Sequence, residues 1–191
     1  MPRHRFQLPP PPRGLSRRAR AIYVLVAAVV SAVASLTVPM CPLADRAGRP
    51  LWRIEAVHDG DTVTCLDERG QPQKIRLQGI DAPEHGQPYG DAARRALAGK
   101  LAGGSVRVEG TARDQHGRLL GTLWIDERDI NRELVAEGYA WVFGGFAPDE
   151  DLLAAEALAR RQRRGLWADD KPVEPRQWRD AHPRNGGGSG G

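Results

Sequence analysis

The chain has 191 residues, of which 40% are hydrophobic and 27% are charged. This length and composition fit one globular domain with tails and exclude a disordered or collagen-like chain. The isoelectric point of about 9.5 depends on the first twenty residues, which hold six arginines and no acid. Removing those six charges from the total of +4 leaves −2 for the rest. The overall charge is therefore no evidence for a polyanionic partner, and binding of a polyanion would need a local arginine cluster.

The first thirty-four residues have the three parts of an export signal. A basic stretch ends at Arg20, an uninterrupted apolar run covers residues 21–30, and Ala32-Val33-Ala34 has the small-residue pattern of a cleavage site. These three features in this order are typical of a secretory signal peptide. We therefore predict a signal peptide over residues 1–34 and a linker over residues 35–50.

An uncleaved membrane anchor is the alternative for the same segment. The apolar stretch extends from Ala21 to about Val38 if its hydroxyl residues are tolerated, which is near the lower limit for spanning a bilayer. Both interpretations export the domain. It is periplasmic or secreted if the signal is removed, and membrane-anchored with an extracytoplasmic domain if the signal is retained.

The two cysteines, Cys41 and Cys65, leave a disulfide open. An exported protein can keep such a bridge. Cys41 lies in the linker, however, and Cys65 lies within a strand pattern, where a thiol packs as a small apolar group. We expect a free Cys65 in the core, with a bridge as the alternative.

Residues 51–170 have the periodicity of one folded domain, and residues 171–191 form an extension with a Gly/Ser-rich tail. Alternating apolar residues predict strands, and helical spacing with cap and stop signals predicts helices. We expect strands over residues 52–57, 61–66, 74–80, 105–109 and 119–125, and helices over residues 89–101, 129–137 and 149–164. The first three strands are close enough for an antiparallel meander. This order predicts an α+β domain with a small closed or partly closed barrel, for which an OB-type barrel is one solution.

Four carboxylates lie at two strand ends. Asp59-Gly60-Asp61 precedes the second strand, and Asp81 and Glu84 follow the third. Asp-Gly alone is a common turn, but pairing as a meander would bring the start of the second strand near the end of the third. Asp61 and Asp81 would then converge. Two carboxylates with a backbone carbonyl make a hard oxygen site suited to calcium, and magnesium remains open on ligand type.

Two arginines complete the candidate site. Arg76 lies five residues before Asp81, so strand alternation puts them on opposite faces unless the chain bends at Gly79. Arg118 ends the turn Asp114-Gln115-His116-Gly117-Arg118, ahead of the fifth strand. A planar guanidinium matches phosphate oxygens, so two arginines can clamp one phosphodiester. Either arginine alone is more simply a solvated surface charge, and only the combination favours a site.

Together and in order, these blocks resemble the signature motifs of staphylococcal nuclease-like domains (thermonucleases). The blocks are Asp59–Thr62, Ile75–Glu84 and Asp114–Arg118, and the likeness continues through Asn131–Val135 and Gly138–Ala140 to Arg164–Trp167. The resemblance implies a five-stranded OB-fold β-barrel with three α-helices. It also implies a calcium-dependent nuclease that hydrolyses DNA, RNA or both and leaves 3′-phosphate and 5′-hydroxyl ends.

The resemblance assigns a role to each matching residue. Asp61, Asp81 and the backbone carbonyl of Ala82 would hold Ca²⁺, with Asp59 in the outer sphere; Glu84 would be the general base; Arg76 and Arg118 would bind the phosphate. Phosphodiester attack builds negative charge on nonbridging oxygens, which a cation and two guanidiniums would stabilise. Glu84 is three residues from Asp81 and can reach a water beside the metal.

Some positions depart from the family pattern. Ala82 replaces a hydroxyl residue of the best-known member, but only its carbonyl is needed. Gln115 and His116 replace a lysine and a tyrosine, and pocket tyrosines are replaced around residues 142–146. Base preference, like the choice between DNA and RNA and between endo and exo action, stays open.

Two non-enzymatic alternatives remain. A non-catalytic OB-fold module that binds nucleic acid or protein is expected to lack some of the carboxylates or arginines, and this chain retains all of them. A calcium-binding domain without catalysis would not need Arg76, Glu84 and Arg118 together. We expect a monomer whose partner is nucleic acid, with a membrane as a partner only if the N-terminal segment is uncleaved.

Overall fold

The computed structural model describes residues 16, 26, 44–45, 47–143 and 149–183. The chain divides into two compact units, Met1–Cys41 and Pro42–Gly191, and the predicted nuclease-like domain belongs to the second. The predicted signal peptide and the alternative anchor lie outside the described residues, two single positions excepted, and stay predictions. In the part of the chain that the structure describes, no helix has the length and apolarity needed to cross a membrane.

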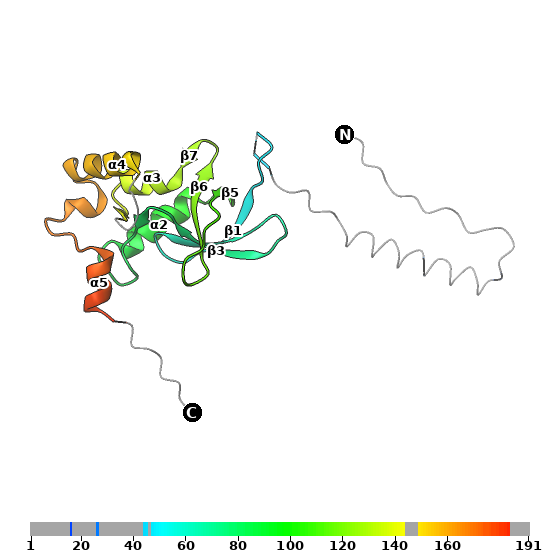
Figure 1. Cartoon of the computed structure of the whole chain (residues 1–191), viewed down its shortest axis with the longest axis horizontal. Coiled ribbons are helices and arrows are strands. Elements are labelled where there is room, and N and C mark those ends of the chain that lie inside the picture. Colours follow the sequence, from blue (N-terminus) through cyan, green and yellow to red (C-terminus); the bar gives the residue numbers. More distant parts are fainter. Residues whose placement is uncertain (1–15, 17–25, 27–43, 46, 144–148, 184–191) are drawn as a thin grey trace, which may run out of the picture. The chain divides into compact units, whose positions relative to one another are not determined.

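A closed β-barrel forms the centre of the Pro42–Gly191 unit (Figure 1). Its five strands are β1 (Trp52–Val57), β2 (Thr62–Leu66), β3 (Pro72–Leu77), β5 (Ser105–Glu109) and β6 (Leu119–Ile125). β1, β2 and β3 pair as the predicted antiparallel meander; β5 pairs with β1, and β6 with β5. The parallel pairing of β3 with β6 closes the barrel, which confirms the α+β, OB-type fold.

Residues that alternate along these strands fill the barrel. Cys65 on β2, Ile75 on β3 and Leu123 on β6 have no measurable exposure. Cys65 is a free cysteine, as expected, and burial raises the pKa of its thiol to about 12. Cys41 lies outside the described residues.

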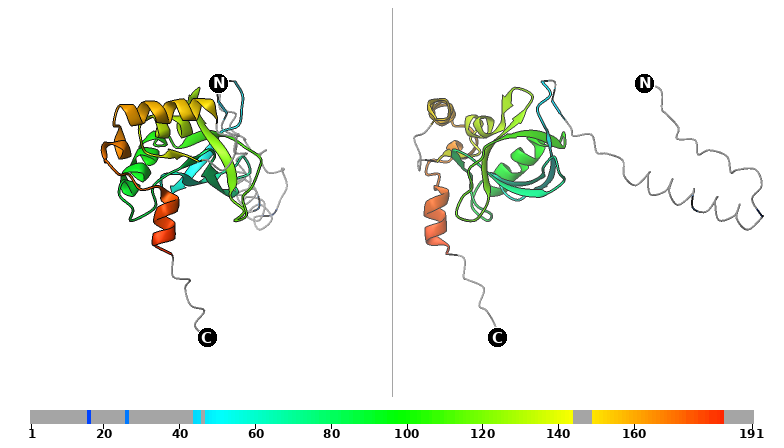
Figure 2. Two further views of the ribbon diagram at one scale, coloured as in Figure 1. Left: turned by 60° about the vertical axis from the view of Figure 1, so that its left-hand side comes forward. Right: turned by 45° about the vertical axis from the view of Figure 1, so that its right-hand side comes forward.

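Among the described residues, four α-helices accompany the barrel, with α3 packed on α4 and α5 lying apart from them (Figure 2). They are α2 (Gly90–Lys100), α3 (Ile130–Ala136), α4 (Glu150–Arg161) and α5 (Pro175–Ala181), with a short 3-10 helix, η1 (Gly165–Ala168), between the last two. Asp129 caps α3 and Asp149 caps α4, each accepting a backbone N–H of the first turn.

The predicted helix count of three was too low, and one predicted end was wrong. α4 ends at Arg161 rather than Arg164, because Arg163 adopts a φ of 53° and turns the chain toward η1. α5 falls in the segment that we treated as a C-terminal extension. It has no apolar stripe of its own, and its buried Pro175 at the first turn fixes it to the domain.

The third predicted strand, residues 74–80, is interrupted by a turn. β3 ends at Leu77, Gly79 has a φ of 78°, and β4 (Ile80–Asp81) then pairs with β8 (Trp141–Val142). β7 (Arg128–Asp129) pairs with β6. A left-handed φ and a site where a Cβ would lie 2.8 Å from Leu152 both favour glycine at position 79. The turn removes Asp81 from the alternation of β3.

Candidate active site

The Asp59-Gly60-Asp61 turn buries one carboxylate at the start of β2. Asp59 Oδ1 accepts the N–H of Asp61 at 3.0 Å, and Asp61 is 6% exposed. The Asp61 carboxylate accepts the N–H of Ala82 at 2.8 Å and the hydroxyl of Thr62 at 3.0 Å. A Cβ on Gly60 would lie 2.7 Å from the β-carbons of Ala82 and Ala93. Glycine therefore allows the turn to lie directly against the segment that follows β4.

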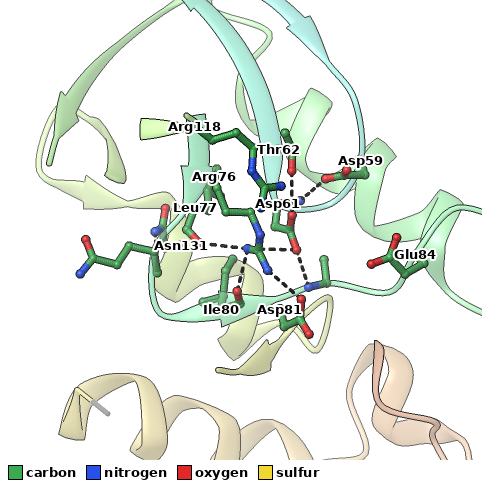
Figure 3. A network of polar contacts seen from close by, with 12 residues as sticks. Asp59, Asp61, Thr62, Arg76, Leu77, Ile80, Asp81, Glu84, Arg118 and Asn131 are labelled. Atoms are coloured by element: carbon green, nitrogen blue, oxygen red, sulfur yellow. Dashed lines mark hydrogen bonds and ion pairs between the residues drawn. The ribbon is translucent and has the colours of Figure 1, made fainter. Parts of the chain in front are cut away.

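One guanidinium joins the carboxylates from the two strand ends (Figure 3). Arg76 lies 2.7 Å from Asp81 and 3.1 Å from Asp61, and it also donates to the carbonyls of Leu77 and Ile80. Strand alternation alone would put Arg76 and Asp81 on opposite faces, and the turn at Gly79 brings them to the same one. The convergence of Asp61 and Asp81 expected from the meander is present.

Asp61 is not fully compensated by these contacts. Burial, together with the charges of Asp59 and Asp81, raises the pKa of Asp61 to about 7, although Arg76 and the N–H of Ala82 oppose the shift. Burial therefore imposes a cost on the ionised form of this carboxylate. An additional cation would relieve it.

Arg118 reaches the same face of the barrel from the turn before β6. Asp114 accepts the backbone N–H groups of His116 and Arg118 and also the Nε–H of Arg118 at 2.7 Å. Arg76 lies opposite Leu120 in the parallel β3–β6 pair, so Arg118, two residues before Leu120, shares the face of Arg76. Among the described residues its ion pair is with Asp114. Arg118 is therefore placed near the site by the pairing of β3 with β6, and its own ion pair is with Asp114 rather than with Asp61 or Asp81.

Glu84 meets an arginine that the sequence analysis missed. Arg179 of α5 has Nη1 2.7 Å from a Glu84 carboxylate oxygen and Nη2 3.1 Å from Asp81 Oδ2. Gln87 joins the same two segments, because its side chain accepts the N–H of Glu84 and donates to the carbonyl of Val173. No local pattern in the sequence links residue 179 with residue 84, since the contact depends on how the C-terminal segment folds back.

A second residue that the sequence analysis did not assign to the site, Asn131, hydrogen-bonds the backbone next to the Gly79 turn. Its side chain is 1% exposed, donates to the carbonyls of Gln78 and Gly121, and accepts the N–H of Leu123. The sequence marked this position only through its likeness to the family. The amide fixes the end of β3 to β6 and α3, next to the turn that releases Asp81.

The tryptophans and the arginines at the end of α4 have structural partners. Trp141 packs edge-on against Trp167, with ring centroids 5.2 Å apart, and Arg160 stacks over Trp167 at 3.8 Å. Arg164 donates to the carbonyl of Ala136. Through these contacts Trp141 and Trp167 pack the region between β8, α4 and η1. Of residues 142–146, where tyrosines of the family are replaced, residues 144–146 lie outside the described residues.

The carboxylate oxygens of Asp61 and Asp81, which converge on Arg76, are of the kind that binds a hard cation. Calcium accepts carboxylate, carbonyl and water oxygens, and Asp61, Asp81 and the Ala82 backbone provide the first two kinds. Within the described residues, no group of three or more His, Cys, Asp or Glu side chains could hold a metal. A cation at this place would therefore depend on two carboxylates, a carbonyl and water. A cation bound to the Asp61 carboxylate would favour its ionised form and so oppose the rise in its pKa that burial causes.

The family model described as Staphylococcal nuclease homologue matches residues 74–169. The chain belongs to the staphylococcal nuclease family. Arg76, Asp81, Glu84 and Arg118 lie inside the matched segment of this family member, whereas Asp61 precedes it and Arg179 follows it.

Curated relatives agree with this membership. The chain is 36% identical over 127 residues to an uncharacterized endonuclease of Haemophilus influenzae, covering 66% of this chain and 71% of the relative. It is 39% identical over 146 residues to Protein ParB of Escherichia coli, covering 68% and 82%. It is 36% identical over 148 residues to a micrococcal nuclease of Shigella flexneri, covering 69% and 84%. Family and relatives together support a hydrolytic nuclease whose substrate is nucleic acid.

Proposed function

We propose that this nuclease depends on calcium, hydrolyses phosphodiester bonds of DNA, RNA or both, and leaves 3′-phosphate and 5′-hydroxyl ends. The observation that carries the proposal is the convergence of Asp61 and Asp81 on the guanidinium of Arg76, with Glu84 beside Asp81. An oxygen-rich cation site, a phosphate-binding arginine and a carboxylate base are the groups that metal-assisted phosphodiester hydrolysis needs.

The cation site is assigned to the two strand ends. Asp61, Asp81 and the backbone carbonyl of Ala82 would hold calcium, with Asp59 contributing through water. Calcium, when bound, would supply positive charge beside a nonbridging phosphate oxygen and beside the attacking water. The same charge would offset the cost that burial places on the ionised Asp61 carboxylate.

Arg76 and Arg118 bind the phosphate in this proposal. Both guanidiniums are already held by carboxylates and share one face of the β3–β6 pair. A guanidinium has five N–H donors, so these bonds leave donors for phosphate oxygens. Arginines that are oriented before the substrate arrives stabilise the charge that grows on the nonbridging oxygens during attack.

Glu84 takes the proton from the attacking water. The water oxygen bonds to phosphorus, the bond from phosphorus to the 5′ oxygen breaks, and the leaving 5′ oxygen takes a proton from solvent, to which Glu84 then returns the proton that it accepted. The products are then a 3′-phosphate and a 5′-hydroxyl. A carboxylate at the mouth of the site, with 22% of its side chain exposed, can reach both water and substrate.

We also place this activity outside the cytoplasm, as a monomer. Support comes from the predicted signal peptide over residues 1–34 and the A-x-A pattern that ends at Ala34. A retained anchor is the alternative. Detection of the cleaved chain in the medium or periplasm, with an N-terminus at Ser35, would support the secreted form.

Hydrolysis of denatured DNA by the purified chain tests the activity and its metal dependence together. We expect cleavage in calcium, loss of cleavage with a chelator, and recovery when calcium is added back. The products should accept a 5′-phosphate from a polynucleotide kinase without prior dephosphorylation, and their 3′ ends should block extension by a polymerase. A folded protein that binds calcium but leaves DNA and RNA intact would favour the non-catalytic OB-fold module instead.

A further inference from the structure

The C-terminal extension folds back onto the candidate active site. Gln87, with 5% exposure, hydrogen-bonds both the Glu84 backbone and the Val173 carbonyl, and Pro175 is buried at the start of α5. These contacts fix the position of α5 relative to the loop that carries Glu84. One turn into the helix, Arg179 points its guanidinium at that loop.

Arg179 bridges two carboxylates that have different roles in the proposed reaction. It lies 2.7 Å from Glu84, the assigned base, and 3.1 Å from Asp81, an assigned metal ligand. A glutamate side chain has several rotatable bonds, so an unanchored Glu84 would sample many positions relative to the attacking water. A planar guanidinium that binds both carboxylates sets the separation between them.

The distances favour positioning over blockage. If Arg179 were a plug for the cation site, its strongest contact would be expected at Asp81. Its Nη1 is instead 2.7 Å from Glu84 and 3.4 Å from Asp81 Oδ1, with Nη2 at 3.1 Å from Asp81 Oδ2. Asp81 also has Arg76 at 2.7 Å. A cation could therefore replace the longer contacts to Asp81 while the short bond to Glu84 remains.

We propose that Arg179 is a positioning residue of this active site, which holds the Glu84 carboxylate in the place where it accepts the proton of the attacking water. The inference rests on the proposed nuclease function. It makes α5, which follows the family-matched segment, a part of the active site. Arg179 acts through Glu84, so its removal should impair the chemical step more than substrate or calcium binding.

The test compares Arg179→Gln with Arg179→Lys and with a control, Arg176→Gln. Arg176 is an exposed arginine on the same helix. The measurements are kcat and KM on denatured DNA at saturating calcium, calcium affinity by calorimetry without substrate, and thermal melting in a chelator. For Arg179→Gln we expect kcat to fall by about tenfold to a hundredfold, as for a misplaced catalytic group, with KM changed by less than about twofold.

Calcium affinity separates positioning from a merely structural role. Removing a positive charge next to Asp81 should leave the calcium affinity of Arg179→Gln unchanged or tighten it. Arg179→Lys should recover part of kcat, because an ammonium group can bind Glu84 but cannot fork across both carboxylates. Arg176→Gln should match the parent protein in all measurements.

Each other outcome overturns the inference. An unchanged kcat in Arg179→Gln would show that Arg179 has no part in the mechanism. A raised kcat would show that Arg179 inhibits the enzyme, and a raised KM with an unchanged kcat would show that it binds the substrate phosphate. A joint loss of kcat, calcium affinity and melting temperature would make it structural. A parent protein that does not cleave would refute the proposed function itself, whereas a cleaving parent with an equally active Arg179→Gln refutes only this inference.

Discussion

Two guanidiniums meet at Asp81, and they come from distant parts of the chain, β3 and α5. Arg76 is five residues away along the chain, and Arg179 is 98 residues away. Both keep the carboxylate of Asp81, a residue that is 6% exposed, in a defined position. Paired arginines make a buried carboxylate tolerable, since an unpaired buried charge would be costly.

The clearest residue-scale prediction concerns Glu84. Glu84→Gln keeps the size of the side chain and an oxygen that can accept from Arg179, but it cannot take a proton. We expect kcat on denatured DNA to fall by about a hundredfold or more, the loss typical of a missing general base. Calcium affinity and thermal melting should stay near those of the parent protein.

Glu55→Gln provides the matched control for Glu84→Gln. Glu55 is exposed on β1, so its substitution removes the same charge at a position that the site does not use. Equal activity of the two variants, both near the parent level, would assign the proton transfer to another group.

At the residue scale, sequence reasoning was sufficient wherever chain connectivity determines the contact. The meander predicts that Asp61 and Asp81 approach, and the alternation rule predicts the bend at Gly79 that lets Arg76 join them. Arg179 could not be found in this way. Its contact with Glu84 spans 95 residues and depends on a helix whose sequence has no periodic signal.

At the element scale, one turn recurs in the domain with different consequences. Asp45–Arg49, Asp67–Gln71 and Asp114–Arg118 each have an aspartate that accepts the backbone N–H four residues later, and a glycine that donates to the aspartate carbonyl. Arg49 and Arg118 both bond the aspartate of their own turn. The bond between the arginine and the aspartate four residues before it is thus a local property of the turn. Only the position of Asp114–Arg118 before β6 relates it to the site.

Asp114→Ala should therefore impair catalysis through Arg118. The substitution removes the acceptor of two backbone N–H groups and of the Arg118 side chain. We expect kcat/KM to fall by about tenfold, which corresponds to roughly 1.4 kcal/mol of lost transition-state stabilisation. Steady-state hydrolysis of denatured DNA measures this change.

Asp67→Ala is the control for the turn itself. It removes the equivalent acceptor in the β2–β3 hairpin, where the last residue is Gln71 instead of arginine. Both variants should lose a similar amount of stability, but Asp67→Ala should keep the parent kcat/KM. Equal losses of activity would mean that the barrel needs the turns and that Asp114 has no particular link with Arg118.

The helices show the limit of element prediction. α3 and α4 were predictable because a capping aspartate and spaced apolar residues act within the element. α5 and the early end of α4 depend on tertiary contacts, namely the burial of Pro175 and Leu166 and the ion pairs of Arg179. Such contacts override weak local propensity.

At the scale of the whole molecule, closure of the barrel brings the residues of the candidate site together and buries the carboxylate of Asp61. Pairing of β3 with both β2 and β6 brings the Asp61 turn, Arg76 and Arg118 to one region. The same closure removes water from Asp61 and raises its pKa to about 7, first through burial. Without a cation, the ionised form of Asp61 is therefore less favourable in the folded state than in the unfolded state.

This charge predicts how stability depends on pH and on calcium. The pKa of Asp61 is higher in the folded state, about 7, than the ordinary value of 3.8. The protonated Asp61 therefore contributes to the free energy of unfolding in full below pH 3.8, and this contribution is lost as the pH rises to about 7. In a chelator, the free energy of unfolding of the parent should fall relative to that of Asp61→Asn between about pH 4 and pH 7, and the difference should be constant above.

Calcium should reverse this difference, because it binds the ionised carboxylate. At pH 8 a calcium concentration of about one hundred times the dissociation constant should stabilise the parent by roughly 2.7 kcal/mol, the mass-action value for a ligand of the folded state. Asp61→Asn should gain much less. Urea unfolding of both proteins across pH, with chelator and with calcium, measures both effects. Parallel pH curves for the two proteins in chelator would show that Asp61 does not titrate in this range, and equal stabilisation by calcium would place the ion away from Asp61.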